Sequence, residues 1–304
     1  MTRATRGWTL AGLLAAGLAL QATATEGGGG AYPNGSEGFM TGALPPLGQY
    51  FINYMAYYSA DSFKGGDGHT DPTKPNFELH AVAEVLRFVN VTPITVLGGN
   101  WAQHVLVPIE WEEARWTPGP KDKNFGLGDI VVDPFIVGWH KPPFHWLVGL
   151  DTYVPVGKYH AVSFANLGRN YWTFEPLLGV TYLNEGGQEL SAKMMYDFNT
   201  PNTDSATPGV STYTSGQEFH TDFVVAQHCG NWAIGVGGYW YYQTTDDKRD
   251  GVRTDGTCGR ALALGPQISY QCCQVNFSLE IDHELAAKNK PQGDKYWLKA
   301  VVPL

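Results

Sequence analysis

After its first twenty-four residues the chain has no long hydrophobic run. Lys, Glu, Asp, His or Asn interrupts each apolar stretch, whereas a membrane-spanning helix needs about 20 consecutive, predominantly apolar residues. Basic residues are also scarce, because 20 Lys and Arg stand against 29 Asp and Glu and give a net charge of −9. The sequence therefore excludes insertion as membrane helices and predicts no nucleic-acid partner, since nucleic-acid binding depends on basic residues that neutralise phosphates.

Catalytic and metal-binding motifs are absent as well. The sequence contains no His-Glu-x-x-His, no Cys-x-x-Cys and no Gly-x-Ser-x-Gly. Four histidines lie near acids and could form a metal site or a hydrolytic centre, but none has a diagnostic spacing: His104, His145, His220 and His228. We expect a protein without catalytic residues, metal or cofactor.

The first twenty-four residues predict export. Arg3 and Arg6 give a basic start, an apolar run follows, and Ala22-Thr23-Ala24 is a small-x-small cleavage site. We interpret residues 1–24 as a cleaved signal peptide; the alternative, a membrane anchor, would need a longer apolar run. Cleavage removes two arginines and no acid, so the mature chain has 18 basic and 29 acidic residues and a net charge of −11.

Alternation of apolar and polar residues dominates the mature chain and predicts β-strands. From Gln188 to Asn199, for example, Leu190, Ala192 and Met194 alternate with Glu189, Ser191 and Lys193. Twelve such runs occur, each long enough to cross a bilayer at the tilt that barrels adopt. The predicted strands are 48–60, 77–90, 94–110, 127–140, 143–155, 171–184, 187–199, 216–229, 231–245, 260–272, 274–285 and 294–304.

The connections alternate in length, as a transmembrane barrel requires. Long connections rich in Gly, Pro, Asp, Asn and Lys are expected at 61–76, 111–126, 156–170, 200–215 and 246–259, with a shorter one at about 286–293. Short turns are expected at 90–93, 140–143, 184–187, 229–231 and 272–274. The sequence thus predicts an all-β, up-and-down antiparallel transmembrane barrel of about twelve strands over residues 48–304, with both termini in the periplasm.

The charged face of each strand should point into the lumen, because a charge at the bilayer midplane costs roughly 2–4 kcal/mol on the lipid side. Aromatic and apolar residues of the opposite parity should face lipid: Tyr50, Ile52, Tyr54, Tyr58, Trp172, Phe174, Tyr182, Trp232, Trp240 and Tyr242. The candidate lumen residues are Tyr57, Glu78, His80, Glu84, Asp129, Asp133, Asp151, Tyr153, Glu189, Lys193, Asp197, Glu218, His220, Asp222, Tyr239, Tyr241, Glu280 and Asp282. The excess of acids favours cations or neutral solutes, and the tyrosines offer stacking surfaces.

Two segments leave alternatives open. Residues 25–47 contain too much glycine and proline and too little periodicity for a strand, and could form either a hatch inside the lumen or a disordered periplasmic tail.

In the oxidising periplasm the four cysteines allow three disulfide pairings. The predicted strands place Cys229, Cys272 and Cys273 at periplasmic turns and Cys258 in an external loop, so a bond from Cys229 to Cys272 or Cys273 is the preferred hypothesis; a copper or zinc site at the adjacent cysteines is the alternative.

Several short motifs occur in a fixed order and spacing across nearly the whole mature chain, beginning with Glu26-Gly27 and Tyr32-Pro33-Asn34-Gly35. The further motifs are 44–50 (LPPLGQY), 57–61 (YYSAD), 126–129 (GLGD), Pro134, 138–139 (GW), 154–159 (VPVGKY), 166–168 (NLG), Asn170, Trp172, Pro176, Tyr213 and 215–218 (SGQE). Together they resemble the putative MetA-pathway phenol-degradation family of outer-membrane barrels. The resemblance implies an uptake role and no enzymatic one. The chain departs from such barrels at its end, Val302-Pro303-Leu304, where an aromatic residue is common.

The function we expect is an outer-membrane channel for passive uptake of small hydrophobic or aromatic compounds. Its partners would be outer-membrane lipids, the barrel-assembly machinery and the solute. Two alternatives remain: a structural or adhesive barrel with a blocked lumen, and a membrane-embedded hydrolase.

Overall fold

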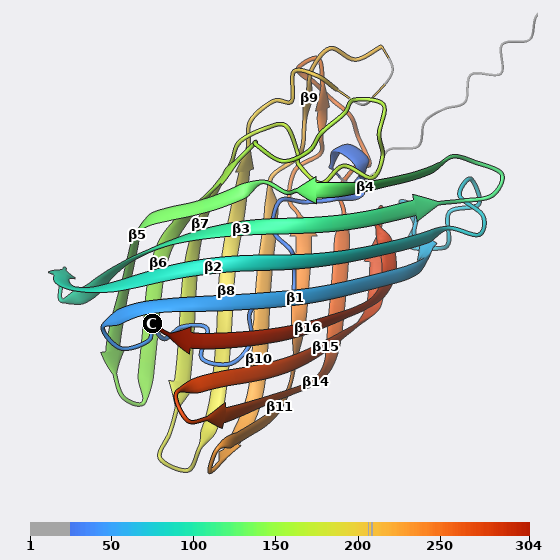
Figure 1. The fold of residues 1–304 in the computed structure, drawn as a ribbon. Coiled ribbons are helices and arrows are strands. Elements are labelled where there is room, and N and C mark those ends of the chain that lie inside the picture. Colours follow the sequence, from blue (N-terminus) through green and yellow to red (C-terminus); the bar gives the residue numbers. More distant parts are fainter. Residues whose placement is uncertain (1–24, 206, 208) are drawn as a thin grey trace, which may run out of the picture.

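The computed structural model describes residues 25–205, 207 and 209–304, so the predicted signal peptide 1–24 lies outside the described residues. Within them no helix is long and apolar enough to cross a membrane. The chain forms a single large antiparallel barrel (Figure 1). The elements are η1 (Glu26–Gly28), β1 (Gly48–Phe63), β2 (Glu78–Val96), β3 (Gly99–Arg115), β4 (Lys121–Leu127), β5 (Ile130–Lys141), β6 (Phe144–Val154), β7 (Thr173–Leu183), β8 (Gln188–Asn199), β9 (Tyr213–Thr214), β10 (Glu218–Cys229), β11 (Trp232–Gln243), β12 (Lys248–Arg249), β13 (Val252–Arg253), β14 (Arg260–Cys272), β15 (Val275–Lys288) and β16 (Pro291–Pro303).

Each wall strand pairs with the next one along the chain, and β1 closes the barrel by pairing with both β2 and β16. Strand β3 pairs with the short strand β4 through its C-terminal part and with β5 through its N-terminal part. Strands β4 and β5 therefore share one position in the wall. The wall therefore has twelve positions, and the predicted fold class and strand number are confirmed. We call the end that carries β9, β12 and β13 the loop end, and the end where β1 begins and β16 finishes the turn end.

Three predicted connections are wrong. The turn expected at 90–93 lies inside β2; the chain reverses instead at Leu97 and Gly98, both with positive φ (50° and 80°), the combination of a two-residue type I′ hairpin turn. Residues 111–115 and 121–126, expected in a long loop, belong to the β3–β4 extension. The connection expected at 286–293 shrinks to Asn289 and Lys290, and Asn289 takes the left-handed conformation that Asn tolerates.

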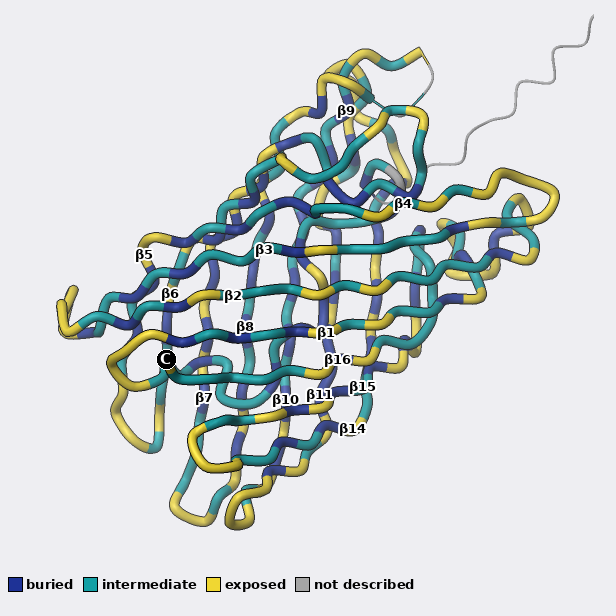
Figure 2. The backbone as a smooth tube through the Cα atoms, viewed as in Figure 1, coloured by how far each residue is buried: buried dark blue, intermediate teal, exposed yellow. Residues whose placement is uncertain are grey.

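Burial alternates along most wall strands (Figure 2). In β7 every second residue from Thr173 to Thr181 is buried and the residues between them are exposed. The buried set is the inner face. On β7, β8, β10 and β15 this inner face is largely polar, whereas on β1 and β2 it carries Tyr54, Ala81 and Val85. The lumen thus has a charged wall and an apolar wall.

At the loop end, β9, β12 and β13 form a small sheet that a buried carboxylate supports. Asp247 accepts hydrogen bonds from Tyr213 Oη (2.5 Å), Gly216 N (2.7 Å) and Gln243 Nε2 (2.7 Å). Burial raises the pKa of Asp247 to about 7, although its hydrogen bonds from Tyr213 and Gly216 oppose the shift. The carboxylate therefore joins the segment 213–216 to the segment 243–247.

Asp247→Ala should loosen this sheet, because each buried donor left without an acceptor costs about 1–3 kcal/mol. Limited proteolysis of the folded barrel should show faster cleavage between residues 200 and 259. Asp255→Ala is the matched control, since Asp255 pairs with Arg253 at the surface and its removal should leave the cleavage rate unchanged. Equal cleavage rates in the two variants would contradict the supporting role of Asp247.

Candidate functional site: the lumen and its inner segment

Residues 25–47 pass through the barrel from one end to the other (Figure 1). At the loop end, Glu26 accepts hydrogen bonds from Asn202 Nδ2 (2.5 Å) and Ser205 Oγ (2.8 Å). The segment then runs along the lumen to Gly48, where β1 begins at the turn end. A methyl group at Gly42 would lie 2.3 Å from the backbone of Val180, so the segment rests directly on β7. Residues 25–47 therefore lie along the inner side of the wall, and their role as a hatch stays a prediction.

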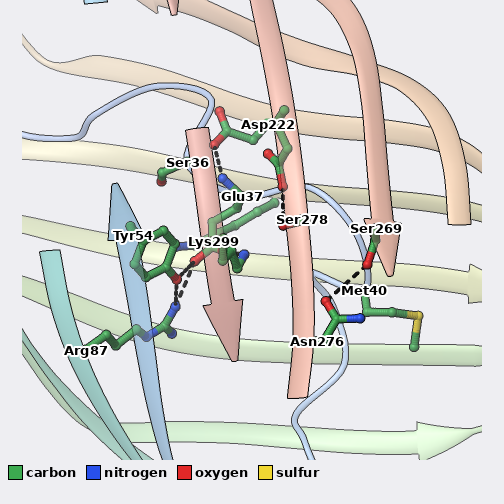
Figure 3. Close-up of polar contacts among 12 residues, drawn as sticks. Ser36, Glu37, Met40, Tyr54, Arg87, Asp222, Ser269, Asn276, Ser278 and Lys299 are labelled. Atoms are coloured by element: carbon green, nitrogen blue, oxygen red, sulfur yellow. Dashed lines mark hydrogen bonds and ion pairs between the residues drawn. The ribbon is translucent and has the colours of Figure 1, made fainter. Parts of the chain in front are cut away.

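Glu37 fastens the middle of this inner segment to two strands of the wall (Figure 3). Its carboxylate lies 2.8 Å from Arg87 Nη1 on β2 and 3.0 Å from Lys299 Nζ on β16. Tyr54 on β1 donates a hydrogen bond to Glu37 and accepts one from Arg87 (2.8 Å). One acid of the inner segment therefore neutralises two cations of the wall that would otherwise lie unpaired in the lumen.

Asp222 on β10 fastens the same segment to the opposite wall. Its carboxylate accepts hydrogen bonds from the backbone N of Gly35 (3.0 Å) and Glu37 (3.1 Å) and from Tyr32 Oη (2.5 Å). Figure 3 shows Asp222 and Lys299 approaching the segment from different strands. Met40 N contacts Glu189 nearer the turn end. Several inner acids thus bind backbone N–H groups of the segment instead of lining open water.

Four acids form a row across neighbouring strands of the charged wall. Asp151 on β6 is the Cα partner of Glu175 on β7, and Asp197 on β8 is the partner of Glu218 on β10. The β7–β8 register, which pairs Phe174 with Phe198, sets Glu175 opposite Asp197. Asp151 is neutralised by His104 (2.8 Å) and Lys193 (3.8 Å). These acids, with His220, are the lumen groups best suited to hold a cation.

A cavity of about 320 Å³ lies between the inner segment and the apolar wall. The lining combines small or apolar side chains with a few charged ones, including Arg87 and Lys193. The apolar and aromatic lining residues of the wall are Tyr54, Ala56, Tyr58, Leu79, Ala81, Ala83, Val85, Leu106, Pro108, Val131, Tyr153 and Trp297. By comparison, an apolar cavity of roughly 150 Å³ holds benzene. The cavity therefore has the size and chemistry for a compound of one or two rings.

Fourteen of the eighteen candidate lumen residues are buried on the inner side of the barrel: Asp129, Asp133, Asp151, Tyr153, Glu189, Lys193, Asp197, Glu218, His220, Asp222, Tyr239, Tyr241, Glu280 and Asp282. Five of them line the cavity: Asp129, Asp151, Tyr153, Lys193 and Tyr239. Their part in a solute path stays a prediction. Several others bind the inner segment or one another, as the Asp222 contacts show.

The orientation expected for Tyr57, Glu78, His80 and Glu84 is wrong, because these residues lie on the outer face of β1 and β2. Tyr57 is 41% exposed and contacts His80 there. Correspondingly, four residues expected toward lipid are on the inner face: Tyr50, Ile52, Tyr54 and Tyr58. The physical reason is that the inner face of these strands borders an apolar cavity, while Glu78 and His80 stand at the loop end of long strands that extend past the hydrocarbon.

The predicted disulfide is also wrong, since all four cysteines are free. Cys229 is the Cα partner of Trp232 on β11, and Trp232 is in turn the partner of Tyr270 on β14. Strand β11 therefore separates Cys229 from the Cys272-Cys273 turn by two strand spacings, roughly 9–10 Å, beyond the reach of a disulfide. In the loop end, burial raises the pKa of the Cys258 thiol to about 11, which keeps it protonated at neutral pH.

Sequence reasoning missed Arg87 and Glu37, which organise the apolar side of the lumen together with His104. Arg87 lies on the inner face of β2, and its Nη2 is 2.9 Å from His104 Nδ1 on β3. Glu37 was not singled out because its segment has no periodicity. The strand's alternation could have located Arg87. Val85, Arg87 and Val89 are alternate residues of β2, so they point to the same, inner face.

A family model described as "Putative MetA-pathway of phenol degradation" matches residues 60–300. No curated protein matches the chain by sequence. Among solved structures, the COG4313 outer membrane channel from Pseudomonas putida F1 is similar with a TM-score of 0.78 at 14% identity, covering 88% of this chain and 98% of that one. The beta domain of the Bordetella autotransporter BrkA gives 0.48 at 9% identity, with coverage of 85% and 100%. At 14% identity the likeness to the COG4313 channel concerns the fold alone.

Proposed function

The chain belongs to the MetA-pathway phenol-degradation family, and from this premise we propose that it is an outer-membrane channel for passive uptake of small hydrophobic or aromatic compounds. The observation that carries the proposal is the cavity beside the inner segment, with Tyr54, Tyr58 and Trp297 along its apolar wall. Apolar pockets with a few placed polar groups are the usual form of sites for small organic molecules.

The outer surface supports a membrane location for this channel. Large apolar side chains are exposed around the barrel, among them Val225, Ile234, Val236, Leu279 and Leu298. Such a band is expected where a barrel faces hydrocarbon. We propose outer-membrane lipids and the barrel-assembly machinery as partners, and export through cleavage of residues 1–24.

Filling the cavity should block uptake. Ala81 lines the cavity, and its neighbour Val82 is 41% exposed on the outer face of the same strand. A Trp side chain at this position would fill much of the cavity of about 320 Å³, so Ala81→Trp should strongly lower the rate of radiolabelled toluene uptake by expressing cells. Val82→Trp, which adds the same side chain on the lipid side, is the control and should leave uptake unchanged.

Uptake that is equal in Ala81→Trp, Val82→Trp and the unmodified protein would exclude this cavity as the path. A barrel that gives no uptake above cells lacking it would instead favour the structural or adhesive role with a blocked lumen. Matched expression in the outer membrane, measured by heat-modifiable migration on gels, makes the rates comparable.

A further inference from the structure

Three carboxylates of the acid row lie together without a Lys or Arg in ion-pair contact. Glu175, Asp197 and Glu218 are each 0% exposed. Among the ion pairs of the described residues, none joins any of the three to a Lys or Arg, whereas the fourth member of the row, Asp151, has Lys193 and His104. Lys193 and Lys290 act on Glu175 and Glu218 only at longer range, without an ion-pair contact. Because a buried carboxylate that is not fully compensated costs several kcal/mol, the three favour a bound cation or shared protons.

One oxygen of each carboxylate also has no hydrogen-bond partner within the described part of the chain: Glu175 Oε1, Asp197 Oδ1 and Glu218 Oε2. The second oxygen of Glu218 accepts from Tyr241 Oη (2.5 Å). Asp197 stands between the other two and contacts both of them. Unpaired buried oxygens on three adjacent strands are what an oxygen-ligated ion would satisfy.

His220, two residues after Glu218 on the same face of β10, adds a nitrogen to this group. Its Nδ1 lies 2.6 Å from Asn34 Oδ1, and its Nε2 lies 3.1 Å from Asp197 Oδ2. When Nδ1–H donates to Asn34, Nε2 carries a lone pair that faces the carboxylate oxygen. A metal-bound histidine is oriented in this way, by donating its other N–H to an oxygen acceptor.

We propose that Asp197, Glu218 and His220 bind one divalent transition-metal ion of the zinc type inside the barrel, with Glu175 as a further carboxylate beside Asp197. One ligand atom of each of the three residues lies within 4.8 Å of the others. Imidazole nitrogen with carboxylate oxygen suits Zn²⁺ and similar ions, whereas Ca²⁺ and Mg²⁺ prefer oxygen alone.

The inner segment covers this metal site. Asn34 contacts His220, and a methyl group at Gly30 would lie 3.2 Å from Glu218 Oε2. A bound ion would therefore be enclosed between β7, β8, β10 and the segment, and would strengthen the attachment of the segment to the wall. This role is separate from solute passage along the apolar wall.

The test is isothermal titration of the full mature barrel, purified in detergent and stripped with EDTA, with Zn²⁺. We expect one ion per barrel, about 100-fold weaker binding in Asp197→Asn and Glu218→Gln, and roughly 10- to 100-fold weaker binding in Asn34→Ala, the range for residues that orient a ligand. Glu280→Gln is the matched control, since Glu280 is a buried inner acid on β15 with an unpartnered oxygen; it should bind as the unmodified protein does.

X-ray absorption of the Zn²⁺-loaded unmodified protein needs no variant and should show one imidazole among oxygen ligands. The proposal is overturned if the unmodified barrel does not bind Zn²⁺, which would mean that shared protons hold the carboxylates together. It is also overturned if folded Glu218→Gln binds as tightly as Glu280→Gln, if the spectrum lacks imidazole, or if Ca²⁺ binds as tightly as Zn²⁺.

Discussion

Deletion of residues 25–47 is expected to raise the single-channel conductance of the barrel several-fold. The inner segment runs from the contacts of Glu26 at the loop end to Gly48 at the turn end and occupies the lumen between the charged and apolar walls. Removing it leaves a water-filled path lined by the inner acids. Because fixed acids in a pore attract cations, the openings should prefer cations. The measurement is conductance in planar bilayers of the mature and shortened proteins, with reversal potentials in a salt gradient.

The deletion leaves all twelve wall positions intact, so the shortened protein should keep heat-modifiable migration on gels, which serves as the folding control. A folded, shortened barrel that conducts no better than the mature one would contradict the hatch interpretation. It would mean that side chains of the wall themselves close the lumen and would favour the structural or adhesive role.

The strands could be predicted because period-two alternation survives along most of them. A barrel strand has one face toward lipid and one toward the lumen. Where the lumen is polar, apolar and polar residues therefore alternate along the strand. The turn at Leu97 and Gly98 escaped prediction because leucine is not a turn-forming residue, whereas Asn90 and Pro93 resemble a turn but lie inside β2. Local turn chemistry was thus less informative than periodicity.

Which face of a strand points into the lumen could be predicted only for strands that carry charged residues on the inner face. On β8, Glu189, Lys193 and Asp197 are all buried inside, as expected. On β1 and β2 the rule fails, because the inner face borders the apolar cavity and the outer face carries acids. These strands have 16 and 19 residues, more than the 9–11 that cross the hydrocarbon, so their loop-end parts can expose charge outside the membrane.

The contacts of the inner segment could not be predicted from the sequence at all. Glu37 meets Arg87 and Lys299 across separations of 50 and 262 residues, and its own segment has no periodicity to orient it. The sequence does show an excess of acids on the inner face. Two of these acids, Asp222 and Glu189, accept hydrogen bonds from backbone N–H groups of the segment. These acids therefore contact the segment directly.

Glu37→Ala is expected to detach the middle of the inner segment from β2 and β16. Arg87 and Lys299 would lose the carboxylate that lies 2.8 and 3.0 Å from them, and breaking a buried pair by removing one partner costs about 3–5 kcal/mol. Bilayer recordings should therefore show frequent brief openings that the unmodified protein lacks. Glu185→Ala, at an exposed position of the β7–β8 turn, is the control and should record as the unmodified protein does.

A double variant shows whether these openings come from the ion pair itself. If Glu37 acts through Arg87, then Glu37→Ala with Arg87→Ala should be less destabilised toward denaturant than the sum of the single variants, by about 0.5–3 kcal/mol, as residues in contact usually are. Lys299 remains unpaired in all variants that lack Glu37, so its cost cancels in the comparison. Additive losses, together with quiet recordings of Glu37→Ala, would mean that the Asp222 contacts alone hold the segment and that the Glu37 pair contributes little to closure.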